Sequence, residues 1–534
     1  MYSASDTCPA APSRSASGGW LALVILLALA SLAGALLIYA TPDGLLIYSG
    51  DSVDYLEGAR NLLAGHGYSA SIPPEPPVPV VHFPPLYSMV IAGFDALVHN
   101  VYEAARWVSV AGFGGSVLLL CALVWRVTER DLTAAVFAGL IFCFNPSLLQ
   151  LFGGAVSETL FIPLGIAGQA ALLIYLDGER KRWLMIAALL LGLTVAARYS
   201  GAVWIATGPL TVLICGRGRF VARFGKACVF GLVSVIPGVA ESIRNKIVSH
   251  TVAGRSLGLH PVSIHHVLDG LQTIGGWFLP WRFARWPFGV AVACGLVALM
   301  AWGLRKTWPQ RPAGAFPFWV STAVFVVLYV AHLVVAVSFL HYNTPIDDRL
   351  LAPVEASAIA VLGVSLGRRK GRAGLRWQEA VCAAVLIFSL CRYPSSLHKA
   401  RLESGGYFGP VWRSSQLIQT LRRLPPDAVI YSNKPVAVYL ALDRPVCAMP
   451  SQLNPMSRKP VEDADAQIAV MEQRLKARNG VLVYFDRPNE DTLYDGGVPL
   501  SRLHEFTEAE IEAKIPLVLV LRADGADVLK PAGS

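Results

Sequence analysis

The chain has 534 residues, of which 54% are hydrophobic and 15% are charged, and its mean hydropathy is +0.50. This composition excludes a soluble globular protein and predicts a mainly α-helical protein that crosses a membrane many times. The net charge of +9 does not indicate nucleic-acid binding, because the basic residues lie in short clusters between apolar runs. Most cysteines lie within apolar runs and no CxxC motif occurs, so neither a disulfide framework nor a structural zinc site is indicated.

About eleven apolar runs predict membrane-spanning helices. They lie near 20–40, 105–126, 132–150, 159–176, 183–198, 200–215, 226–243, 287–304, 316–340, 350–367 and 376–392. The run 86–98 is too short to cross a bilayer and predicts a helix in the membrane interface. With that run excluded, the short basic clusters fall on one side of the membrane, which the positive-inside rule identifies as the cytoplasm. The polar tail 1–19 is then cytoplasmic.

The first loop, 41–104, is expected outside the cytoplasm and carries charged residues directly after the first span. Charge beside hydrocarbon is costly and is usually retained for a function. Asp51 begins a predicted helix, where it either caps the free amides or acts as a general base. Asp54 continues the same helical face. His82 precedes a phenylalanine and two prolines, and is either structural or placed where its proton or charge meets a phosphate.

Glu158 lies at the expected outer end of the segment between the third and fourth spans. The structural interpretation is that Ser157 caps the next helix and Glu158 favours the positive end of that helix. The functional interpretation is a second acidic group on the face that carries the first loop.

Three arginines share this outer face. Arg198 lies between two short spans, Arg349 follows two aspartates at the start of a late span, and Arg244 begins the basic outer loop 244–286. Arginine side chains can extend to the interface without a function, and long loops escape the charge rule. Alternatively, their guanidinium groups bind a phosphate at that depth. The shared location of these residues with the acidic groups is a stronger argument than any one of them.

Residues 393–534 differ in composition from the preceding chain, because polar helical stretches alternate with short apolar runs. The runs 428–431, 480–485 and 516–521 predict strands, and 462–478 predicts a helix. This alternation predicts a small α/β domain, and the odd number of spans places it outside the cytoplasm. It lacks a nucleophile motif, a metal-ligand cluster and a phosphate loop, so we expect the chemistry within residues 20–392.

In combination these motifs resemble the GT-C superfamily of integral-membrane glycosyltransferases, over roughly residues 20–392. The nearer branch contains the protein O-mannosyltransferases, the lipid A aminoarabinose transferase and the Rgt-like bacterial glycosyltransferases. Four strings carry the resemblance: Gly50-Asp51-Ser52, His82-Phe83-Pro84-Pro85-Leu86, Ser157-Glu158-Thr159-Leu160-Phe161 and Arg349-Leu350-Leu351-Ala352-Pro353. Strings of this length are specific only together.

The resemblance implies transfer of a sugar, with inversion, from a polyprenyl-phosphate donor to a glycan, lipid or protein acceptor at the extracytoplasmic face of the plasma (inner) membrane. The implied site residues are Asp51 as general base, Glu158 as a second acid that helps to hold the acceptor or a metal, Arg349, Arg244 and His82 as contacts to the donor phosphate, and Arg198 and Asp54 as additional candidates. Many relatives carry glutamate where this chain has Ser52, and aspartate where it has Glu158. The resemblance therefore leaves a divalent metal cofactor open.

Two other functions are compatible with a protein of many spans. A transporter or lipid flippase would favour internal repeats and ionisable residues in mid-span, and the sequence shows neither clearly. A non-enzymatic membrane anchor for an outer binding domain leaves the acidic first loop and the basic outer loop without a role. The sequence therefore favours the transferase.

Overall fold

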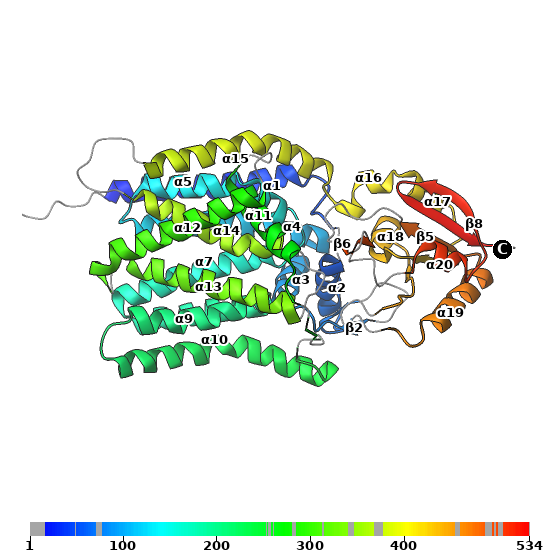
Figure 1. The fold of residues 1–534 in the computed structure, drawn as a ribbon, viewed down its shortest axis with the longest axis horizontal. Coiled ribbons are helices and arrows are strands. Elements are labelled where there is room, and N and C mark those ends of the chain that lie inside the picture. The colour runs from blue at the N-terminus through cyan, green and yellow to red at the C-terminus, as the bar shows by residue number, and fades with distance from the viewer. Residues whose placement is uncertain are drawn as a thin grey trace, which may run out of the picture.

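The computed structural model describes residues 16–47, 50–70, 77–252, 254, 258–259, 261–279, 285–311, 314–339, 346–367, 377–453, 460–485, 494–495, 498–499 and 506–532. Most of the predicted tail, 1–19, lies outside these residues. A bundle of long helices and a smaller unit with a β-sheet follow one another along the long axis of the molecule, with α2 (Gly50–Leu63) and α3 (Leu86–Val98) between them (Figure 1).

The bundle contains most of the helices, packed around one extended apolar core. They are α1 (Ala16–Ala40), α4 (Val101–Val127), α5 (Leu132–Cys143), α6 (Pro146–Phe152), α7 (Glu158–Gly178), α8 (Lys181–Ala197), η1 (Tyr199–Gly201), α9 (Ala202–Cys215), α10 (Phe220–Ser249), α11 (Ile264–Phe278), α12 (Trp286–Thr307), η3 (Trp308–Gln310), α13 (Phe316–Phe339), α14 (Asp348–Leu366) and α15 (Trp377–Leu402). The predicted membrane fold, mainly helical with many spans, is confirmed.

The number of spans is lower than the predicted eleven when helix length and composition are applied. Eight of the described helices are long and apolar enough to cross a membrane, or up to nine if α5 and α6 are one bent span. The difference lies in α8 and α9, which occupy the predicted runs 183–198 and 200–215. They have 17 and 14 residues, whereas a straight crossing takes about 20.

The predicted span 132–150 is broken into α5 and α6, whose axes differ by 62°. Pro146 has no amide hydrogen with which to continue α5, and its ring suits the first turn of a new helix. Asn145 caps that helix, because its Oδ1 accepts hydrogen bonds from the backbone amides of Ser147 and Leu148 at 2.9 and 3.2 Å. Hydropathy alone missed the break, since the apolar run continues through it.

The first loop forms a layer between the bundle and the β-sheet unit (Figure 1). It contains α2 (Gly50–Leu63) and α3 (Leu86–Val98), and the latter occupies the run predicted as an interfacial helix. The two helices pack on each other and on α4 through an apolar cluster that includes Tyr55, Tyr87 and Val108. Between them β1 (Ser69–Ala70) pairs antiparallel with β2 (Val78–Pro79).

The C-terminal unit is built on a five-stranded sheet of order β4-β3-β5-β9-β8. β3 is parallel to β4 and β5, whereas β9 is antiparallel to β5 and β8. The elements are η4 (Gly406–Phe408), α16 (Pro410–Arg413), α17 (Gln416–Arg422), β3 (Ile430–Ser432), α18 (Pro435–Leu442), β4 (Cys447–Ala448), α19 (Ala464–Ala477), β5 (Val481–Phe485), β6 (Tyr494–Asp495), β7 (Val498–Pro499), α20 (Glu508–Glu512), β8 (Leu517–Ala523) and β9 (Ala526–Pro531). The predicted small α/β unit is confirmed.

The C-terminal unit is attached to the first loop by backbone hydrogen bonds and by apolar packing. The amide of Gly405 donates to the carbonyl of Gly44 at 3.0 Å, and the amide of Tyr407 donates to that of Ile47 at 3.2 Å. Gly405 has a φ of +79°, which glycine adopts without strain. Leu440 of α18 joins the apolar cluster around α2 and α3. The C-terminal unit therefore supports the helix that carries Asp51.

Candidate functional site

Arg349 connects two carboxylates from distant parts of the chain. Its Nη1 lies 2.6 Å from Oδ2 of Asp51, and its Nε lies 2.6 Å from Oε1 of Glu158. All three residues lie in the first turns of helices, α2, α7 and α14. Asp347 caps α14 by accepting a hydrogen bond from the amide of Leu350 at 3.0 Å. Because a cation is unfavourable at a helix N-terminus, the two carboxylates offset the effect of the α14 dipole on Arg349.

Glu158 is shared between two guanidinium groups. Nη1 of Arg198, which follows α8, pairs with the same Oε1 that Arg349 contacts. Glu158 has no exposed surface, whereas the side chains of Arg349 and Asp51 are 27% and 32% exposed. A buried carboxylate requires paired cations, so the two arginines stabilise its charge. Asp51 and Arg349 are the members of the cluster that a ligand reaches most easily.

The start of α7 is held in place by the first loop and by α4. The amide of Leu46 donates to the carbonyl of Gly153 at 2.8 Å, and the amide of Ala155 donates to the carbonyl of Leu46 at 3.2 Å. On the α4 side, a Cβ added at Gly112 would lie 2.3 Å from the carbonyl oxygen of Thr159. The absence of a side chain at Gly112 therefore allows the turn that carries Glu158 to approach α4 closely.

Tyr55 links α2 to the start of α7. Its hydroxyl donates to Oγ of Ser157 at 3.1 Å, and that Oγ lies 3.5 Å from Oε2 of Glu158. Burial raises the pKa of Tyr55 well above its ordinary value, so the hydroxyl keeps the proton that it donates. The expectation that Ser157 caps α7 was wrong, because its side chain makes no cap hydrogen bond and is used by Tyr55 and Glu158.

Asp54 and His82 form a second polar pair beside this cluster. Nε2 of His82 lies 3.0 Å from Oδ2 of Asp54, and both side chains are partly exposed. Asp54 follows Asp51 by one turn on α2, so the two carboxylates share one face of the helix. The ring of Phe83 packs against both His82 and Tyr55, with centroid distances of 4.5 Å and 5.1 Å.

Arg244 lies outside the cluster and binds the backbone of the first loop. It belongs to α10, which extends further into the predicted outer loop than expected. Its guanidinium donates to the carbonyls of Val80 and Tyr68, the latter at 2.6 Å, and lies 5.2 Å from the centroid of the Tyr68 ring. Tyr199 strengthens the attachment by donating its hydroxyl to the carbonyl of Val81 at 2.7 Å.

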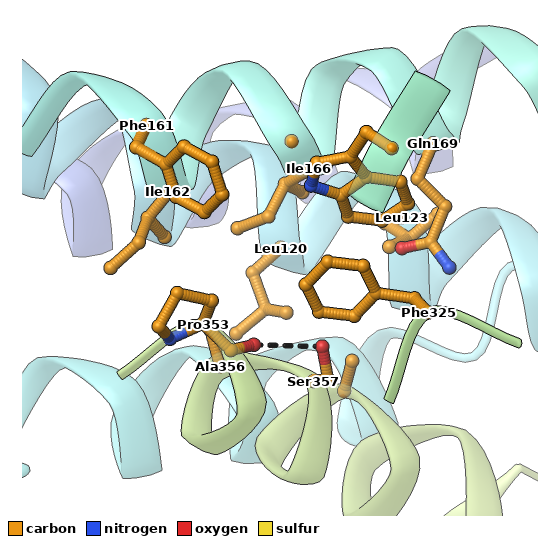
Figure 2. Close-up of a pocket in the computed structure, with 13 residues that line it drawn as sticks. Leu120, Leu123, Phe161, Ile162, Ile166, Gln169, Phe325, Pro353, Ala356 and Ser357 are labelled. Carbon is orange, nitrogen blue, oxygen red and sulfur yellow. Dashed lines mark hydrogen bonds between the residues drawn. The ribbon is translucent and has the colours of Figure 1, made fainter. Parts of the chain in front are cut away.

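A mainly apolar cavity lies within the bundle, and Figure 2 shows the side chains that line it. Phe161 and Ile162 come one turn after Glu158 on α7, and Pro353 comes one turn after Arg349 on α14. The volume of the cavity is about 20 Å³, which holds about one water molecule. The cavity is therefore too small to hold a sugar or a lipid phosphate, and it lies one helical turn from Glu158 and Arg349.

Sequence reasoning missed two buried acids within predicted spans, Glu241 of α10 and Glu355 of α14. Glu355 is the more deeply buried. It has no exposed surface, and its Oε1 accepts a hydrogen bond from Nδ2 of Asn145 at 2.7 Å. The signal in the sequence is an acidic residue within the predicted span 350–367. In the described part of the chain, no three histidine, cysteine, aspartate or glutamate side chains are grouped closely enough to hold a metal ion.

No protein-family model matches the sequence, and no curated protein matches it significantly. Similar folds occur among solved structures. ArnT from Cupriavidus metallidurans in the apo state gives a TM-score of 0.57 at 13% identity, over 96% of this chain and 98% of ArnT. The same protein bound to undecaprenyl phosphate gives 0.54 at 14% identity, over 97% and 99%. A mutant of the arabinofuranosyltransferase AftD from Mycobacteria gives 0.50 at 13% identity, over 97% of this chain and 42% of AftD.

The likeness to ArnT extends over nearly the whole of both chains, so it includes the first loop, the bundle and the C-terminal unit. At such low identity it establishes the architecture. The chain is accordingly a multi-pass membrane protein with a fold similar to that of ArnT.

Proposed function

We propose that this protein is a membrane glycosyltransferase that moves a sugar from a polyprenyl-phosphate donor to an acceptor at the extracytoplasmic face. The observation that carries the proposal is the reachable Asp51–Arg349 pair, anchored on a buried carboxylate at an edge of the helical bundle. The ArnT structure with bound undecaprenyl phosphate supports a polyprenyl phosphate as the donor carrier. Such a carrier brings an activated sugar to a membrane face where nucleotide sugars are not available.

In the proposed reaction, Arg349 exchanges one of its partners. The donor phosphate competes with Asp51 for Nη1, while Glu158 retains the Nε contact that orients the guanidinium. Asp51, released from Arg349, accepts the proton of an acceptor hydroxyl. The acceptor oxygen then bonds to the anomeric carbon as the bond from that carbon to the phosphate oxygen breaks. The configuration inverts, and Arg349 stabilises the charge of the departing phosphate.

The other predicted site residues take different roles in this proposal. Glu158 is fully buried, so it serves as an anchor for Arg349 and Arg198 rather than as a direct contact to the acceptor. His82 and Asp54 lie on the accessible side and are the next candidates to contact the donor. The predicted phosphate contact of Arg244 stays a prediction, because that side chain binds the first loop in this structure.

The proposed topology places the N-terminus in the cytoplasm and the C-terminal unit outside. It requires an odd number of crossings, as in the count of nine with α5 and α6 as one bent span. α2, which carries Asp51, lies at the end of the bundle that faces the C-terminal unit (Figure 1), so the cluster and the C-terminal unit both face the extracytoplasmic side in this assignment. The positive-inside distribution of the basic clusters supports the orientation, and the inner membrane is the expected location.

The test compares the envelope glycans of cells that lack the gene with those of cells that carry it. Mass spectrometry should reveal a sugar substituent that disappears with the gene and returns with the wild-type gene. Asp51→Asn should fail to restore it although the protein inserts normally, whereas Asp95→Asn, a matched change in the same loop, should restore it. If labelled donor crosses the membrane intact and no glycan changes, the protein is a transporter and the proposal is wrong.

A further inference from the structure

A hydrogen bond deep in the bundle connects the broken span to α14. Nδ2 of Asn145 donates to Oε1 of Glu355 at 2.7 Å, and neither residue has any exposed surface. The second carboxyl oxygen of Glu355 has no hydrogen-bond partner among the described residues. Burying a carboxyl group is costly unless the group is hydrogen-bonded, so this single contact is a strong constraint on both segments.

The side chain of Asn145 is fixed at both of its ends. Its oxygen accepts from the amides of Ser147 and Leu148 and thereby caps α6, while its nitrogen is held by Glu355. An asparagine in this position cannot flip without losing all three contacts. The start of α6 is therefore fastened to α14 in one orientation.

The two fastened segments, α6 and α14, position two members of the charged cluster, Glu158 and Arg349. α6 leads through Gly153 and Ala155 directly to Glu158, the first residue of α7. α14 carries Arg349 in its first turn and Glu355 about 9 Å further along the axis. The Asn145–Glu355 bond and the Glu158–Arg349 bond thus join the same two parts of the chain, one inside the bundle and one at its edge.

We propose that Asn145 and Glu355 are positioning residues, whose hydrogen bond sets the distance between Glu158 and Arg349. They act through the placement of α6 and touch no substrate. The expected effect on sugar transfer rests on the proposed function. The expected energetic coupling between the Asn145–Glu355 bond and the Glu158–Arg349 bond does not.

The first experiment measures transfer of the sugar by purified full-length variants. Glu355→Leu should lower kcat/KM by about tenfold or more, because the distance between Glu158 and Arg349 is then no longer fixed. Glu355→Gln retains an oxygen that accepts from Asn145 and should stay close to wild type. Ser365→Ala is the matched control, since this buried serine bonds to the carbonyl of Leu362 in its own helix, and its activity should be unchanged.

A double-mutant cycle separates positioning from general loss of stability. The combination of Glu355→Leu with Glu158→Gln should be no slower than Glu158→Gln alone, whereas independent effects would multiply. Equal loss in Glu355→Gln and Glu355→Leu, or multiplied losses in the combination, would overturn the proposal. If only Asp51→Asn inactivates the enzyme, the positioning role fails while the proposed function stands.

A second cycle uses thermal unfolding and needs no activity. Asn145→Ser keeps a good capping residue for α6 but is too short to reach Glu355. In that background the fall in unfolding midpoint caused by Glu158→Gln should shrink by roughly half, because the two bonds support each other. An unchanged fall would contradict the coupling. A confirmed coupling in a protein without transferase activity would leave this inference intact and remove the proposed function.

Discussion

At the residue scale, Arg349 depends on the shape of its guanidinium, which reaches Asp51 with one nitrogen and Glu158 with another. A lysine keeps the charge but presents a single ammonium, so it cannot hold both partners and a phosphate. We expect Arg349→Lys to raise the KM for the lipid-linked donor by about tenfold or more. Steady-state kinetics against donor concentration measures this change. Arg60→Lys, at a partly buried pair with Glu57 on the same helix as Asp51, is the control. An unchanged KM in Arg349→Lys would mean that Arg349 does not bind the donor.

Glu158 gives a prediction about stability. Glu158→Gln leaves two guanidinium groups, those of Arg349 and Arg198, without their shared anion inside the protein. Breaking a buried charge pair costs about 3–5 kcal/mol, so the unfolding midpoint in detergent should fall clearly. Glu57→Gln, which removes a more weakly buried acid from α2, should have a much smaller effect. Equal falls in the unfolding midpoint would show that the buried Glu158 contributes no more to stability than the less buried Glu57.

At the element scale, the contact between α4 and α7 depends on a glycine. A Cβ at Gly112 would lie 2.3 Å from the backbone oxygen of Thr159, so Gly112→Ala must move the first turn of α7 away from α4. We expect a loss of transfer of about tenfold or more, since Glu158 belongs to that turn. Gly115→Ala on the same helix meets no atom within 4 Å and should be neutral. Full activity of Gly112→Ala would show that the position of this turn does not matter.

The sequence predicted helices better than it predicted their ends and directions. Long apolar runs indicate helices locally, and the short runs 480–485 and 516–521, which contain several valines, indicate strands. The structure has helices and strands at these places. β4 has only two residues, and no local pattern predicts it. α5 ends before Asn145 within an apolar run, so hydropathy does not reveal the break, although the Asn145-Pro146 pair marks it locally. Their form depends on partners such as β3 and Glu355, which lie far away in the sequence.

The candidate site was predicted in part. Asp51, Glu158, Arg198 and Arg349 were selected as separate residues of one face, and the structure brings these four together. Their pairing could not be read from the sequence, because it depends on where three helices begin in space. Arg244 was selected by the same reasoning and lies elsewhere, since charge alone does not reveal that its partners are backbone carbonyls.

At the scale of the whole molecule, the topology can be tested directly. Alkaline phosphatase fused after residue 534 should be active, because it folds only outside the cytoplasm and we place the C-terminal unit there. A fusion within the short segment 179–180, between α7 and α8, should be inactive. The reverse pattern of activities would overturn the assignment of the cluster to the extracytoplasmic face.

The bond between Asp51 and Arg349 spans 298 residues of the chain, and this separation has a consequence for how the protein is made. During synthesis Asp51 and Glu158 enter the membrane long before the ribosome reaches α14, and Leu440, which supports α2, follows later still. A nascent chain that stops before α14 holds Asp51 without its cation, and Glu158 with Arg198 as only one of its two cations. We expect such truncated chains to be recognised and degraded by the membrane's quality-control proteases, so that catalytic competence arises only when nearly the whole chain has been translated.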